Sequence, residues 1–201
     1  MIQLSSKRYE EIKVVVADVV EDYGLGYPLD PWELAGKLGV DVYRYNPDKV
    51  SPWLQPSCGD GGGYTVKISL PVGYAWMVFL KGSDSRERLT FTLAHELGHI
   101  ILNHSCSNES YVREEQEANF FASYLLMPDI IARILFSPVS PQDVMGFCGV
   151  TASCAWEMCR RINRVYKGKY EIKDYEFRII EAFFIQENLK AKNRLDLREI
   201  S

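Results

Sequence analysis

The sequence predicts an α+β protein that is mainly helical, with a small sheet of about three strands and a helical C-terminal segment. Apolar residues recur at intervals of three and four in most of the chain, which is typical of amphipathic helices. Between residues 40 and 80, three short stretches instead alternate or are bulky and apolar, which favours strands. The 201 residues are 47% hydrophobic and 25% charged, the usual balance of a globular protein with a sizeable core.

The first predicted elements are two helices. One covers residues 6–22, where Ile12 and Val16 lie on its apolar face. The other begins after Asp30, because Asp suits the N-cap and the following Pro31 suits the first helical position.

The three predicted strands cover residues 40–45, 63–70 and 75–80. A loop rich in Pro, Ser and Gly joins the first two, over residues 47–62. Long loops are often functional rims or lids. A surface insertion that the fold merely tolerates is an equally good interpretation of this one.

The rest of the chain is predicted to be helical. The expected helices cover about residues 85–103, 110–126, 129–136, 140–148, 152–166 and 174–190. The last ten residues are charged, and we expect them to be frayed. We expect a domain of residues 1–137 with a helical appendage, 138–201, packed on it, or one continuous domain.

Charge and cysteine content favour a cytoplasmic protein. The net charge is −4, but residues 160–201 carry 11 basic and 7 acidic residues. The five scattered cysteines are expected to be reduced and mostly buried. The N-terminus becomes charged too early for a secretory signal, and no stretch approaches the roughly 20 apolar residues of a membrane span.

The histidines form a cluster. The chain has only three, His95, His99 and His104, and all lie within ten residues. The run His95-Glu96-Leu97-Gly98-His99 is expected on a helix, where positions i and i+4 share a face. Two imidazoles so placed can bind one zinc ion, with Glu96 close enough to act on a water. Gly98 is costly in a helix interior, so we infer a close neighbour there.

A third ligand is expected from the next helix. Glu115 is the preferred candidate, because Asn119 lies one turn further on the same face and can accept the Nδ1–H of a ligating histidine. Glu114 remains a weaker rival, and Glu117 is expected at the surface. His104 is a less favoured ligand, and lining a cleft or capping the helix are alternative roles for it.

Two histidines and one glutamate leave a coordination position open, as in catalytic zinc sites. Two imidazoles and a carboxylate suit Zn²⁺ among the divalent metals. Glu96 is then the expected general base for hydrolysis. The group that stabilises the oxyanion is left open among Tyr111, Tyr124, His104 and the glycine-containing loop.

These motifs resemble those of the ImmA/IrrE metallopeptidases. The resemblance is carried by Arg86–His99, by Glu115–Ala122 with the following Leu125-Leu126-Met127-Pro128, and by an upstream pattern over residues 27–40. It covers about residues 8–166. The paired central motifs are specific.

The resemblance implies a gluzincin-like zincin core with ligands His95, His99 and Glu115 and the base Glu96. It also implies a site-specific endopeptidase. The implied substrate is a regulatory protein, such as a helix-turn-helix repressor of a mobile element or a stress response.

Residues 140–166 resemble a helix-turn-helix unit. Arg160, Arg161 and Arg164 could contact phosphates, but the second helix begins with few base-reading side chains, so a structural or docking role is favoured. One alternative function is therefore a non-catalytic antitoxin-like or DNA-binding regulator that retains a structural metal site. Another is hydrolysis of a non-peptide amide.

Overall fold

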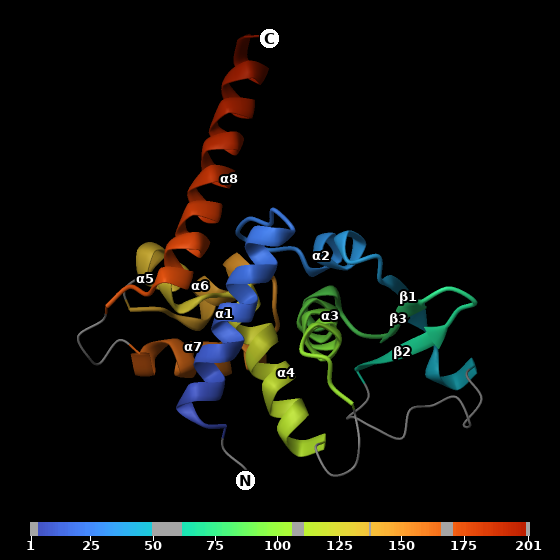
Figure 1. Ribbon diagram of the computed structural model, residues 1–201. Coiled ribbons are helices and arrows are strands. Elements are labelled where there is room, and N and C mark those ends of the chain that lie inside the picture. Colours follow the sequence, from blue (N-terminus) through green and yellow to red (C-terminus); the bar gives the residue numbers. More distant parts are fainter. Residues whose placement is uncertain (1–3, 50–61, 106–110, 137, 166–170, 200–201) are drawn as a thin grey trace.

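The computed structural model describes residues 4–49, 62–105, 111–136, 138–165 and 171–199, and it is mainly helical with one small sheet (Figure 1). This confirms the predicted α+β class. The elements in chain order are α1 (Ser6–Asp22), α2 (Pro31–Lys37), β1 (Asp41–Tyr45), the short 3₁₀ helix η1 (Pro47–Lys49), β2 (Gly63–Ser69), β3 (Tyr74–Lys81), α3 (Arg86–Ile101), α4 (Tyr111–Leu126), α5 (Asp129–Leu135), α6 (Pro141–Cys148), α7 (Ala152–Val165) and α8 (Asp174–Glu199).

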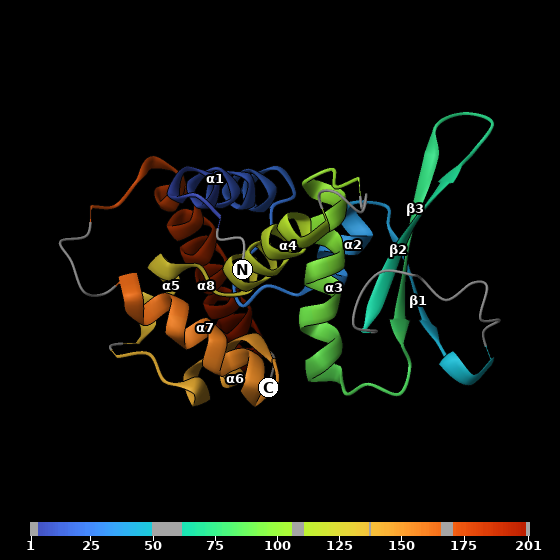
Figure 2. The same ribbon diagram turned by 90° about the horizontal axis from the view of Figure 1, so that it is seen from below.

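The sheet has three strands in the order β1-β3-β2. β1 runs parallel to β3, with Asp41 opposite Met77, and β2 runs antiparallel to β3, with Gly63 opposite Leu80. Helix α3 contacts β2 and β3, so the sheet lies beside the helix that carries the histidine pair (Figure 2). The predicted strand positions are confirmed to within one residue at each end.

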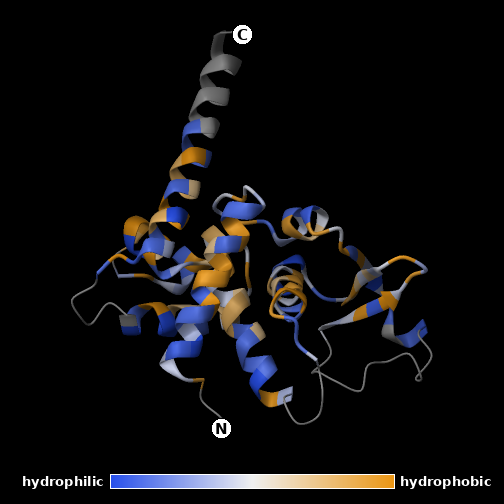
Figure 3. Cartoon of the chain, viewed as in Figure 1, coloured by the Kyte–Doolittle hydropathy of each residue, from blue (hydrophilic) through white to orange (hydrophobic). Residues whose placement is uncertain are grey.

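Helix α4 lies between α1 and α3 and contacts both. Leu89, Leu93 and Leu97 of α3 and Phe121 and Leu125 of α4 are fully buried. Apolar residues of α1 and α4 gather at the middle of the molecule, and polar residues occupy the ends of these helices near the N-terminus (Figure 3). Because α4 has neighbours on two sides, side chains on opposite faces of it are buried.

The C-terminal helices follow the predicted pattern as far as α7. Ser140 and Asp143 form a capping box at the start of α6, and Gly149, with φ of +62°, ends that helix. The predicted end of the last helix at residue 190 is wrong, because α8 continues to Glu199 and extends beyond the body (Figure 1). The charged segment that was expected to fray contains good helix formers and neither Gly nor Pro. The division after residue 137 stays a prediction.

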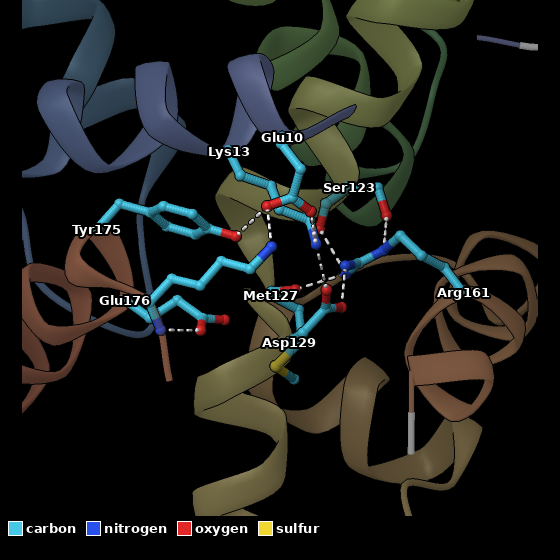
Figure 4. A network of polar contacts seen from close by, with 9 residues as sticks. Glu10, Lys13, Ser123, Met127, Asp129, Arg161, Tyr175 and Glu176 are labelled. Atoms are coloured by element: carbon cyan, nitrogen blue, oxygen red, sulfur yellow. Dashed lines mark hydrogen bonds and ion pairs between the residues drawn. The ribbon is translucent and has the colours of Figure 1, made fainter. Parts of the chain in front are cut away.

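A network of charged groups joins α1, α4, α5 and α7 (Figure 4). Asp129, which is 1% exposed, forms ion pairs with Arg161 and with Lys13, the latter at 3.4 Å. Arg161 also donates hydrogen bonds to the Ser123 hydroxyl at 3.0 Å and to the Met127 carbonyl at 2.5 Å. The network therefore anchors α7 on the helices that form the core.

One helical stretch among the described residues, Tyr111–Leu135, is long and apolar enough to cross a membrane by length and composition alone. The core helix of a soluble protein passes the same test, and 67% of the most apolar window is buried inside the protein. The stretch comprises α4 and α5, which pack in the core.

The first prediction concerns the buried network. Asp129→Ala leaves the positive charges of Lys13 and Arg161 without their buried partner. We expect the free energy of unfolding to fall by about 3 to 5 kcal/mol, as measured by chemical denaturation. The matched control is Glu157→Ala, because the Glu157–Arg160 ion pair is exposed. Its removal should change the free energy by less than about 1 kcal/mol. Equal effects of the two substitutions would contradict this account.

Candidate metal centre

The histidine pair lies in the second half of α3. Ser85 caps the helix start, accepting a hydrogen bond from the Arg88 backbone N–H, and the helix continues to Ile101. His95 and His99 are one turn apart, and their Nε2 atoms are 3.0 Å from each other. The two rings therefore point to one place, as the spacing predicts.

Glu115 completes this group from α4. Its Oε1 is 3.2 Å from His99 Nε2, and its Oε2 is 3.4 Å from His95 Nε2. Zinc bonds of about 2.0–2.1 Å at tetrahedral angles place neighbouring ligand atoms about 3.3 Å apart. The three distances, 3.0, 3.2 and 3.4 Å, lie around that value. The donor set thus fits one tetrahedral cation with a fourth position open to a water or substrate.

Asn119 lies behind His95. Its Oδ1 is 3.1 Å from His95 Nδ1, the contact that the spacing of Glu115 and Asn119 predicts. An amide oxygen only accepts hydrogen bonds, so this contact places the hydrogen on Nδ1 and leaves the Nε2 lone pair directed at the centre. A ligating histidine needs this tautomer.

The charge of Glu115 depends on the two imidazoles. Burial alone would raise the pKa of Glu115, but hydrogen bonds from His95 and His99 outweigh it and lower the pKa to about 2. The Nε2 atoms of both imidazoles face this carboxylate. Protons and a metal cation are thus alternative sources of the positive charge that the carboxylate requires.

Glu96 lies beside this group and is 7% exposed. The Thr65 hydroxyl of β2 donates a hydrogen bond of 2.8 Å to Glu96 Oε2. Burial raises the pKa of Glu96, although the neighbouring His95 and the Thr65 hydrogen bond act in the opposite direction. Sequence reasoning missed Thr65. Its position on a strand was predictable, but its pairing with a residue 31 positions away was not.

The prediction that Glu117 lies at the surface is wrong. The residue is 3% exposed, and its Oε2 accepts from Arg8 at 2.5 Å and from His104 Nε2 at 3.2 Å. It does point away from Glu115, but α1 covers that face of α4. Glu114, the rival ligand, accepts from the backbone N–H and hydroxyl of Ser105, at 3.1 Å each, and is outside the donor group.

His104 is outside the donor group too. Its Nδ1 is 3.0 Å from His99 Nδ1 and its Nε2 faces Glu117, so both ring nitrogens are engaged behind the centre. Burial lowers the pKa of His104, while the Glu117 hydrogen bond raises it less strongly. The expected role at the end of α3 is taken by the His104 backbone, whose N–H donates to the His99 carbonyl at 3.0 Å, while its side chain contacts a candidate ligand.

The structure reduces the number of candidates for the group that stabilises the oxyanion. Tyr124 is fully buried, with its ring 5.5 Å from both Lys13 Nζ and Arg161 Cζ, so it is wrong as an oxyanion donor. Tyr111 stays a prediction as the oxyanion donor, and residues 50–61 of the predicted loop lie outside the described residues.

Of the three arginines that could contact phosphates, Arg161 forms an ion pair with Asp129. Arg160 and Arg164 are exposed.

The described cysteines behave as predicted. Cys148, Cys154 and Cys159 are free thiols, and Cys148 and Cys159 are buried. Burial raises the pKa of each, in Cys154 to about 12. Cys58 and Cys106 lie outside the described residues.

A cleft of about 850 Å³ lies between α1, α4 and α7, behind His95. Phe91, one turn before His95, and Asn119 line the end near the candidate ligands. Tyr9, Phe120 and Met158 contribute further apolar surface. The candidate ligands, Glu96 and Thr65 are not among the residues that line the cleft.

Comparison with protein families supports the same chemistry. Residues 54–140 match the family model Peptidase_M78, described as an IrrE N-terminal-like domain. The matched range includes β2, β3, α3 and α4, and so contains the candidate ligands, Glu96 and Thr65. The match confirms the ImmA/IrrE resemblance and supports a metallopeptidase-type role with protein as the substrate class. No curated protein matches the chain.

The second prediction concerns the contact between α3 and α4. A Cβ on Gly98 would lie 3.0 Å from Phe121 Cδ1 and 3.4 Å from Ala118 Cα, which confirms the inferred close neighbour. Gly98→Val should separate the helices, lowering the free energy of unfolding by about 1 to 3 kcal/mol. It should also weaken metal binding, because Glu115 moves away from the histidines.

Thermal unfolding and zinc titration measure these two effects. The matched control is Gly36→Ala in α2, where a Cβ meets no atom within 4 Å. This change should leave zinc binding unchanged and preserve or raise stability. Zinc affinity equal to wild type in Gly98→Val would show that the helix contact does not position the ligands.

Proposed function

We propose that the protein is a zinc-dependent endopeptidase whose ligands are His95, His99 and Glu115. The observation that carries the proposal is the tetrahedral spacing of these three donors, with the buried carboxylate of Glu96 alongside. The Peptidase_M78 match supports the peptidase part of the proposal.

A zinc ion bound by these residues supplies a Lewis acid for attack on a carbonyl. Glu96 serves as the general base, taking a proton from the attacking water and passing it to the leaving amine. The Thr65 hydroxyl holds one carboxylate oxygen of Glu96, which fixes the orientation of the other. Asn119 accepts the hydrogen bond from His95 Nδ1, which leaves the lone pair of His95 Nε2 available to a metal ion.

One feature of the sheet supports a polypeptide as the substrate. Strand β2, which carries Thr65, has a strand neighbour on one side only in the described part of the chain, so its other edge can pair with an extended peptide.

The finer identity of the substrate rests on the family resemblance. We propose a cytoplasmic regulatory protein, such as a helix-turn-helix repressor of a mobile element or a stress response. Cleavage of such a repressor at one site would inactivate it and so allow the genes that it represses to be transcribed. The test uses repressors encoded near the gene of this protein as candidate substrates.

The third prediction tests the role of Glu96. Glu96→Gln should bind zinc as wild type does, because the ligands are unchanged. It should cleave the substrate about 10² to 10⁴ times more slowly, because the base is lost. Zinc content by elemental analysis and cleavage followed by mass spectrometry measure the two properties.

Two further variants make the result decisive. His95→Ala should lose both zinc and cleavage, whereas Glu87→Gln, an exposed acid on the same helix, should keep both. If Glu96→Gln retains full cleavage, the proposed general base is wrong. If wild-type protein binds no zinc, the metal site is wrong.

A further inference from the structure

A chain of buried polar contacts lies behind His99, on the side away from Glu115. Arg8 of α1 contacts Glu117 of α4 at 2.5 Å, and Glu117 contacts His104 Nε2 at 3.2 Å. His104 Nδ1 then lies 3.0 Å from His99 Nδ1. The His104 and Glu117 side chains are each 4% exposed, so water competes little for these contacts.

The chemistry of each group fixes the direction of each hydrogen bond. A carboxylate only accepts, so the contact with Glu117 places a hydrogen on His104 Nε2. A neutral imidazole with its hydrogen on Nε2 is an acceptor at Nδ1. The contact between the two Nδ1 atoms then requires the hydrogen to be on His99 Nδ1. In the neutral form of His99 the lone pair is then on Nε2, the atom that faces His95 and Glu115 and would bind a metal ion.

We propose that His104 is a positioning residue, which together with Glu117 holds His99 in the tautomer that binds the metal. This rests on the proposed function, since the metal centre is part of it. His104 stands to His99 as Asn119 stands to His95, because each supplies an acceptor for the Nδ1–H of a ligand. The candidate centre thus has both imidazoles oriented from behind, by two unrelated side chains.

A purely structural role for His104 explains the contacts less well. Glu117 already has Arg8 at 2.5 Å and Arg113 at 3.5 Å, so its charge is compensated without His104. His104 is therefore not required to neutralise a buried carboxylate. Its other contact is the acceptor for His99 Nδ1.

Two amide substitutions separate the two contacts of His104. Asn places its amide oxygen near the position of the imidazole Nδ1, so His104→Asn keeps the acceptor for His99 and loses the donor to Glu117. Gln places its amide nitrogen near the position of Nε2, so His104→Gln keeps the donor to Glu117 and loses the acceptor. A space-filling or carboxylate-binding role favours Gln, whereas the proposed role favours Asn.

The fourth prediction is measured as zinc affinity, by competition with a chromophoric chelator. His104→Asn should stay within roughly threefold of wild type, and His104→Gln should bind zinc about 10- to 100-fold more weakly. His99→Ala serves as the reference for loss of a ligand. Equal affinities of wild type and His104→Gln, or an Asn variant as weak as the Gln variant, would overturn the proposal.

A second measurement uses metal-free wild-type protein, so its result does not depend on whether a variant folds. In metal-free wild-type protein, ¹⁵N-resolved imidazole spectra should show the hydrogen of His99 on Nδ1. A His99 Nδ1 without a hydrogen would overturn the assignment, whether or not Nε2 carries one. This result is independent of cleavage: wild-type protein that binds no zinc defeats the proposed function, whereas normal zinc binding with the wrong tautomer defeats only the role of His104.

Discussion

The packing of α3 against α4 is the contact on which the candidate centre depends. Gly98 allows this approach, because a side chain there would meet Phe121 and the backbone of Ala118. His95 and His99 lie on either side of Gly98 along the helix, and Glu115 lies one turn before Ala118. The residues that set the distance between the helices are therefore neighbours of the residues that converge, and a small change in packing displaces the ligands directly.

Features that depend on one helix or one turn could be predicted from the sequence. Asp30, Ser85 and Ser140 mark helix starts through their own capping contacts. The histidine pair and the pair of Glu115 and Asn119 each share a face of one helix, and this spacing is sufficient to predict which atoms converge. The α+β class and the strand positions follow from local patterns of the same kind.

Features that need a third element could not be predicted. The prediction for Glu117 takes only α3 as a neighbour of α4, whereas α1 covers the opposite face. Tyr124 is likewise buried on a face that one helix pair would leave open. Thr65 reaches Glu96 from a strand whose register with the rest of the fold is set by the sheet. In each case the missing information was the position of another element.

The side chains that support the candidate ligands include some outside the residues that the family model matches. Arg8, which holds Glu117, lies on α1, and α1 precedes residues 54–140. Helix α8 in turn holds α1, through ion pairs from Arg178 to Asp18 and Glu21 at 2.7 and 2.8 Å. Because a ligand tautomer is decided by the last acceptor in a hydrogen-bonded chain, elements that contribute no ligand still bear on the metal site. Helices α1 and α8 therefore support the side chains behind His99, although both lie outside the matched range.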